Sequence, residues 1–128
     1  MPIGLWCLAE MTKTFLFVMR KPAHSGAFVR ETLDIVLTTA AFDQTVSLLL
    51  LDDAVFNLKR GQHVGLGLRD TAAMFEALPL YEVNNIYVEY ESLLERGMQG
   101  QDFILPVQAI ARTAVSAFLA QFDVIFPC

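Results

Sequence analysis

The stretch Thr14-Phe15-Leu16-Phe17-Val18-Met19 decides the fold class, because it is a continuous apolar run of strand length. A run that is apolar on both faces is typical of a buried strand in a parallel sheet with helices on both sides. Residues 20–26 interrupt this run with a loop, in which Pro22 fixes the backbone. A helix is then predicted over residues 27–41 with Ser25 as N-cap, since apolar residues recur there at helical spacing.

Strands and helices continue to alternate along the rest of the chain. The sequence predicts, in order, a strand over 44–51, a helical turn over 54–58, a helix capped by Asp70 or Thr71 and ended by Pro79, a strand including 86–88, a helical turn over 92–96 stopped by Gly97, a strand over 103–105, a helix over 108–122 and a strand over 124–126. Strands separated by helices pair in parallel through right-handed crossovers. We therefore predict an α/β fold, a three-layer sandwich with a mostly parallel five-stranded sheet.

Length and composition predict one domain with an ample core. The 128 residues are 55% apolar and include ten Phe, and each large side chain that is buried contributes about 1.5–3 kcal/mol. No disulfide or metal is needed at this size. We expect residues 1–12 to form an N-terminal extension and residues 13–128 to form the domain.

The high apolar content does not indicate a membrane helix. The longest leucine run, residues 48–51, has four residues before an aspartate, whereas a spanning helix needs about 20 apolar residues. Buried parallel strands together with an obligate protein interface explain the high apolar content better, because the surface of such an interface is as apolar as a protein core.

Charge and cysteine content limit the classes of partner. The net charge of −5 argues against direct nucleic-acid binding, which depends on Lys and Arg neutralising phosphates. The two cysteines, Cys7 and Cys128, show no pairing pattern, and no secretion signal precedes the domain. We therefore expect a cytoplasmic location, with no membrane contact.

Tyr87 occupies the position where chemistry is expected. It follows Asn85-Ile86 near the end of the third apolar stretch, and the carboxyl ends of parallel strands are where α/β proteins place their sites. No thiol, imidazole or base–hydroxyl pair stands near it in the sequence. An enzyme-like scaffold without a nucleophile at this position suggests the partner of an enzyme.

Other polar candidates have two interpretations each. Asp52 and Asp53 follow the second strand. They are either a pair of acids at a functional site or helix caps. Capping is favoured, because no further ligand lies at metal-binding spacing, and we predict neither a metal nor a cofactor. His24 is either a base, or a cation for a partner's thiolate, or a loop residue packed on Pro22. The glycine-rich loop 61–67 lacks the Lys-Ser/Thr of a phosphate loop and suggests a surface loop.

The aromatic residues Phe56, Tyr87 and Tyr90 lie at or near predicted strand ends. They are either ordinary packing residues or anchors of a subunit interface, in whose buried centre aromatic side chains are enriched. The terminal Cys128 lacks a neighbouring cation or helix N-terminus that would activate it, so an incidental thiol is the default interpretation.

The chain as a whole resembles the DsrE/DsrF/TusC family of small sulfur-relay proteins, in particular its TusC (DsrF) branch. The resemblance covers about residues 13–126 and rests on the order and spacing of these segments: residues 17–26, 31–34, 51–58, 60–62, 81–83, 86–88, 92–97 and 122–126. It implies a flavodoxin-like domain that assembles with two sister subunits, of the TusB/DsrH and TusD/DsrE types, into a heterohexamer.

The resemblance also implies a role. Such complexes pass persulfide sulfur to a downstream carrier protein, for 2-thiouridine synthesis in tRNA or for sulfur oxidation. In the sulfur-carrying sister a cysteine follows the Asn-Ile pair, whereas here Tyr87 does. The expected function is thus a non-catalytic subunit, which forms a homo-oligomer if it assembles alone. The alternatives are a stand-alone sulfurtransferase using Cys128 or Cys7, and a small-ligand binding module using the 61–67 loop.

Overall fold

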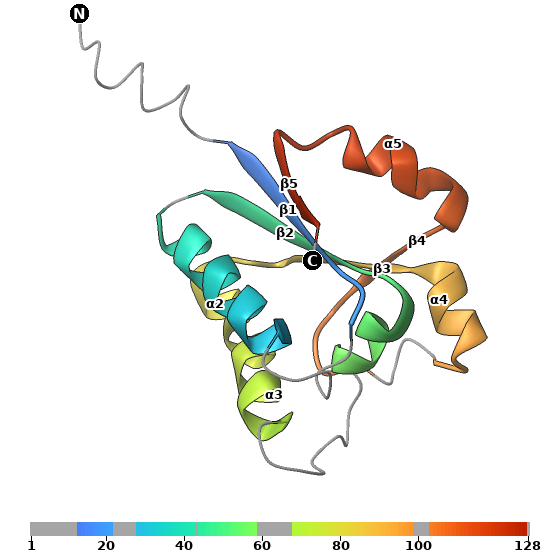
Figure 1. Ribbon diagram of the computed structural model, residues 1–128, viewed down its shortest axis with the longest axis horizontal. Helices are drawn as coiled ribbons and strands as arrows, with labels where there is room; N and C mark the ends of the chain where they lie inside the picture. The colour runs from blue at the N-terminus through green and yellow to red at the C-terminus, as the bar shows by residue number, and fades with distance from the viewer. Residues whose placement is uncertain (1–12, 22–27, 43, 59–67, 99–102, 128) are drawn as a thin grey trace, which may run out of the picture.

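The computed structural model describes residues 13–21, 28–42, 44–58, 68–98 and 103–127. Within these ranges the chain forms a five-stranded sheet in the order β4-β3-β2-β1-β5, and every neighbouring pair is parallel (Figure 1). The strands are β1 (Thr14–Met19), β2 (Thr45–Leu50), β3 (Asn85–Glu89), β4 (Gln108–Ile110) and β5 (Val124–Pro127). The α/β sandwich is confirmed, with a sheet that is parallel throughout.

The helices cover the two faces of the sheet unequally (Figure 1). One face carries α2 (Phe28–Ala41) and α3 (Leu68–Ala77), while the other carries α5 (Val115–Leu119). A short helix, α4 (Tyr90–Glu95), directly continues β3. The described residues also form the 3-10 helices η1 (Asp52–Leu58), η2 (Leu78–Tyr81) and η4 (Arg112–Ala114).

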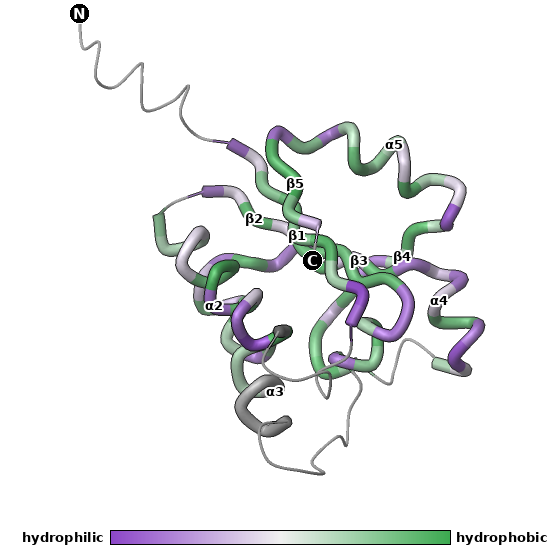
Figure 2. The backbone as a smooth tube through the Cα atoms, in the orientation of Figure 1, coloured by the Kyte–Doolittle hydropathy of each residue, from purple (hydrophilic) through white to green (hydrophobic). Residues whose placement is uncertain are grey.

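Side-chain alternation along the central strands divides the core into two clusters. Phe17 and Leu48 point toward α2 and α3 and belong to the larger cluster, with Val29 and Phe75 from those helices. Leu16 and Leu49 point the other way and pack against half-buried residues of α5 and its flanks, including Phe118. Most residues along β1 and β2 are apolar (Figure 2), and their buried side chains contribute to both clusters. Burial on both sides is the reason these strands appear in the sequence as largely apolar runs.

Two of the predicted elements are wrong. The strand expected over residues 103–105 is not formed: Phe103 makes an isolated bridge and is buried in the larger core, and the amide of Ile104 donates to the carbonyl of Leu58 at 2.8 Å. The fourth strand lies later, because the backbone of residues 108–110 pairs with β3. The helix expected over 108–122 is therefore reduced to α5, preceded by η4.

Smaller differences concern helix boundaries. α3 begins at Leu68, so Asp70 and Thr71 lie inside the helix and the prediction that either caps it is wrong. Gly97 follows α4 with a positive φ of 66°, as expected for a residue that closes a helical turn. The expected extension of residues 1–12 lies outside the described residues. Among those described, no helix combines the length and apolarity required to cross a membrane.

Candidate functional site

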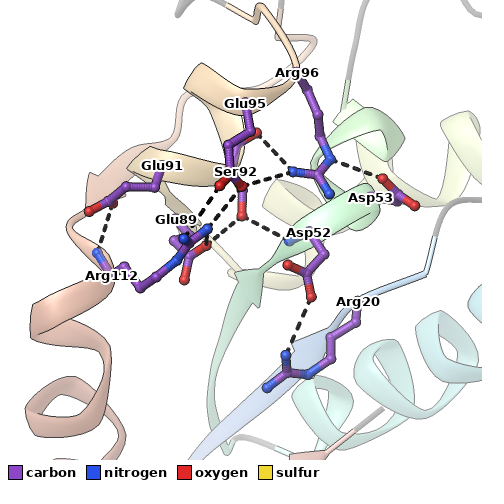
Figure 3. A network of polar contacts seen from close by, with 9 residues as sticks. All are labelled: Arg20, Asp52, Asp53, Glu89, Glu91, Ser92, Glu95, Arg96 and Arg112. Atoms are coloured by element: carbon purple, nitrogen blue, oxygen red, sulfur yellow. Dashed lines mark hydrogen bonds and ion pairs between the residues drawn. The ribbon is translucent and has the colours of Figure 1, made fainter.

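A network of charged side chains lies where β1, β2 and β3 end and η4 begins (Figure 3). Parallel strands bring these positions to one edge of the sheet. The network contains these residues: Arg20, Asp52, Asp53, Glu89, Glu91, Ser92, Glu95, Arg96 and Arg112. It contains no thiol.

Glu89 is the buried centre of this network. It is the last residue of β3, and its side chain is only 7% exposed. Its Oε1 atom accepts hydrogen bonds from Ser92 Oγ at 2.5 Å and from Arg112 Nη2 at 2.9 Å. Burial by itself raises the pKa of Glu89, but the hydrogen bonds from Arg112 and Ser92 and the charges of Arg112 and Arg20 outweigh it and hold that pKa below its ordinary value. The carboxylate is therefore ionised and paired.

Ser92 joins the ends of two strands. Its side chain is fully buried, and its Oγ atom donates to Glu89 while accepting a hydrogen bond from the backbone amide of Asp52 at 2.9 Å. Asp52 has a left-handed backbone, with φ of 53°, a conformation that Asp tolerates better than most residues. The serine hydroxyl is thus occupied on both sides and serves as a link between β2 and β3.

Arg112 fastens the start of η4 to α4. Its guanidinium contacts Glu89 and also Glu95, at 3.0 Å between Nη2 and Oε1, and its backbone amide donates to Glu91 Oε1 at 2.8 Å. The hydrogen bonds to Glu89 and Glu95 raise the pKa of Arg112, and the hydrogen bond from Arg112 lowers the pKa of Glu95. The segment that leads into α5 is therefore held by hydrogen bonds from Arg112 to three carboxylates.

Asp52 and Asp53 lie in the first turn of η1 and make ion pairs. Arg96 Nε donates to Asp53 Oδ1 at 2.9 Å, and Arg20 Nη1 lies 3.4 Å from Asp52 Oδ2. Within the described residues no group of three or more His, Cys, Asp or Glu side chains is arranged to hold a metal. The two aspartates therefore belong to the strand-end edge, as the sequence predicted, with arginines as their partners.

Tyr87 is in the middle of β3, so its expected position at the strand end is wrong; Glu89 occupies that end. The ring of Tyr87 packs against that of Phe118 in α5, with 4.6 Å between the ring centroids. Tyr90 begins α4 and is 49% exposed, and Phe56 is half-buried against the larger core. His24, both cysteines and the 61–67 loop lie outside the described residues.

Only Asp52 and Asp53 of this network were predicted from the sequence. The other seven members were not: Arg20, Glu89, Glu91, Ser92, Glu95, Arg96 and Arg112. A weak signal was present, because Glu89 and Ser92 are three residues apart directly after an apolar strand. The sequence contained no such signal for Arg112, because the helix predicted over 108–122 placed this residue away from β3.

Comparison with known proteins agrees with this fold. The model of the DsrE/DsrF-like family matches residues 13–127. The chain belongs to the DsrE/DsrF-like family. A relative in Pseudomonas aeruginosa, "Protein TusC homolog", is 38% identical over 114 residues, which is 88% of this chain and 96% of that protein. The "Intracellular sulfur oxidation protein DsrF" of Allochromatium vinosum is 39% identical over 98 residues, covering 76% of this chain and 72% of that protein.

A solved structure of low sequence similarity shows the same fold. The crystal structure of the YchN protein from E. coli matches with a TM-score of 0.75 and 16% identity, covering 91% of this chain and 100% of that one. At this identity the match concerns the fold. The family model and the two relatives place this chain in the TusC/DsrF sulfur-relay family.

Proposed function

We propose that this chain is a non-catalytic subunit of a cytoplasmic sulfur-relay complex, in which it supports persulfide transfer by a thiol-bearing sister subunit. Its role is to hold the sister in shape and to contribute part of the surface that receives the next carrier. The partners are two sister subunits of the TusB/DsrH and TusD/DsrE types and a downstream sulfur-carrier protein, assembled as a heterohexamer of the TusBCD or DsrEFH kind.

One observation carries this proposal: the strand-end edge has the position of an active site but, among the residues that the structure describes, no thiol that can hold sulfur. The sequence from residue 13 to residue 127 contains no cysteine. The one serine in the network, Ser92, is fully buried with its hydroxyl committed to Glu89 and Asp52. Transferable sulfur in proteins is carried on a thiolate, so this edge supports a relay in which a sister subunit supplies the reactive thiol.

The acceptor pathway is tRNA 2-thiouridine synthesis or sulfur oxidation. The name of the relative in Allochromatium vinosum, an intracellular sulfur oxidation protein, supports the second route. The resemblance to the TusC branch supports the first, and the relative in Pseudomonas aeruginosa has nearly equal identity. The role proposed for this chain, to hold the sister subunit in shape and to contribute part of the carrier-binding surface, is the same in both routes. The net charge of −5 supports contact with protein rather than with the RNA itself.

Assembly provides the test of this proposal. The chain would be co-expressed with candidate sister subunits of the two types, and the native mass of the purified particle would be compared with that of the chain alone. We expect a heteromeric particle that contains all three kinds of subunit. A well-behaved monomer that ignores both sisters would remove the proposed role.

A further inference from the structure

The outer face of α4 presents two large apolar side chains to solvent. Tyr90 is 49% exposed and Leu94 is 58% exposed. They are four residues apart on a helix and therefore project from the same face. The opposite face of α4 is buried through Ser92 and Leu93. Neighbouring exposed apolar side chains on a fixed element are typical of an interaction surface.

The network beside this face holds α4 in place. Arg112 bonds to Glu89 and Glu95, and Arg96 bonds to Asp53 and to the carbonyl of Ser92 at 3.2 Å. The helix is thus joined to η1 on one side and to η4 on the other (Figure 3). A surface fixed in this way loses little conformational freedom when a partner binds.

The charged network that holds α4 is predominantly negative. The network has five carboxylates, those of Asp52, Asp53, Glu89, Glu91 and Glu95, and three guanidinium groups, those of Arg20, Arg96 and Arg112. Two negative charges are therefore in excess. Asp52 and Asp53 pair with Arg20 and Arg96, so the excess lies with Glu89, Glu91 and Glu95, for which Arg112 is the remaining guanidinium of the network. The side chain of Glu95 is 53% exposed, so part of this charge faces solvent.

This charge pattern indicates which kind of partner can bind the exposed face of α4. A second copy meeting the same face in a two-fold dimer would bring carboxylates against carboxylates, which is unfavourable. Nucleic acid would be repelled for the same reason. A protein surface with an apolar centre and Lys or Arg at its rim is complementary to both features.

We infer that the face of α4 defined by Tyr90 and Leu94, with the acidic side chains Glu91 and Glu95 of the same helix, is the docking site for a sister subunit whose contact surface is apolar at its centre and basic at its rim. This inference rests on the proposed function and adds to it the place and the chemistry of one contact. Tyr90 and Leu94 fill the apolar centre, and the exposed carboxylates set the orientation and the association rate.

Two opposite substitutions at one position test the inference. Leu94→Lys and Leu94→Glu both remove the apolar contact, but they differ in the sign of the added charge. The affinity of each variant for the co-expressed sister subunits would be measured against wild type at low and at high salt. Thr38→Lys, on the exposed side of α2, adds the same charge as Leu94→Lys at a distant polar position. Thermal unfolding of each variant would show whether it is folded.

We expect Leu94→Lys to weaken binding on the order of tenfold or more, Leu94→Glu to weaken it less, and Thr38→Lys to leave it unchanged. High salt should reduce the difference between the two Leu94 variants. Wild-type binding that survives both Leu94 substitutions would overturn the inference and leave the proposed function standing. A larger loss with Glu than with Lys would overturn the basic partner, and so would a homodimer of the isolated chain that Leu94→Lys dissociates. Failure of wild type to bind either sister would remove the proposed function itself.

Discussion

Oε1 of Glu89 accepts a hydrogen bond from Nη2 of Arg112 at 2.9 Å, although the two residues are 23 positions apart in the sequence. Glu89 ends β3 and Arg112 begins the segment that leads into α5. That segment covers one face of the sheet with a five-residue helix and with side chains that are only half-buried. A fixed contact at its start therefore matters more for this layer than it would for α2, which has its own large apolar face.

Arg112→Met should lower the melting temperature and loosen the α5 layer, because it leaves the buried carboxylate of Glu89 without its cationic partner. Thermal unfolding and amide hydrogen exchange of residues 112–122 would report the two effects. Arg20→Met is the matched control, since the Arg20–Asp52 pair is longer at 3.4 Å and exposed at 61% and 48%, and exposed pairs contribute little. Equal effects of the two substitutions would contradict the special position of Arg112.

Ser92→Ala should destabilise the fold by about 1–3 kcal/mol, because two buried groups, the carboxylate of Glu89 and the amide of Asp52, lose a hydrogen-bond partner. Chemical denaturation measures this change in the free energy of unfolding. Ser116→Ala, at an exposed position of α5, should change it by less than about 0.5 kcal/mol. A neutral Ser92→Ala would show that the link between β2 and β3 is not needed.

Stability should depend on pH partly through Glu89. Its pKa is lower in the folded state than in the unfolded state, where it lies near the ordinary value of 4.5. The unfolded state therefore binds the proton first, and the contribution of Glu89 is complete above about pH 4.5 and is lost as the pH falls through the folded-state pKa. The pKa values of Glu95 and Asp123 are lowered too, by hydrogen bonds from Arg112 and from Thr14, so wild type has additional acid dependence.

The variant Glu89→Gln isolates the Glu89 part of that dependence. The difference in the free energy of unfolding between wild type and Glu89→Gln should be largest near neutral pH and should shrink as the pH falls below about 4.5. Denaturation curves recorded between neutral pH and pH 3 give this difference. A difference that is constant over that range would show that Glu89 is not ionised and paired in the folded protein.

Tyr87 should act through packing. Tyr87→Phe preserves the ring that lies 4.6 Å from that of Phe118, so we expect unchanged stability and unchanged assembly. Tyr87→Ala should destabilise by roughly 1–3 kcal/mol, because it opens space beneath α5. Chemical denaturation of both variants is the measurement. A loss of sulfur transfer in Tyr87→Phe at wild-type stability would assign a chemical role to the phenol instead.

The sequence predicted the central part of the fold for a clear physical reason. β1 and β2 are buried on both faces and α2 is buried on one, so continuous and helical apolar patterns stand out in the sequence. β4 could not be found in this way: it has three residues, and its identity comes from pairing with β3, which local patterns do not report. Ile110 fits a helical spacing with Val115 and Phe118, yet it packs beside them from a strand.

The candidate site was predicted only in part for a related reason. The strand-end position of Asp52 and Asp53 follows from the apolar run before them, but their partners Arg20 and Arg96 are 32 and 43 residues away. Glu89 resembled the polar start of a helix, because a buried carboxylate is recognised only through the groups that bond to it. The three-dimensional arrangement was needed to bring these groups together.

A sulfur-transfer assay with a cysteine-free variant tests the central claim most directly. The double variant Cys7→Ser/Cys128→Ser would be assembled with the two sister subunits, and transfer of labelled sulfur from a persulfide donor to the carrier protein would be followed by mass spectrometry. We predict wild-type transfer and no label on this chain in either complex. Loss of transfer in the double variant, with label found on Cys7 or Cys128 of the wild-type chain, would contradict the account and make this subunit a sulfur carrier itself.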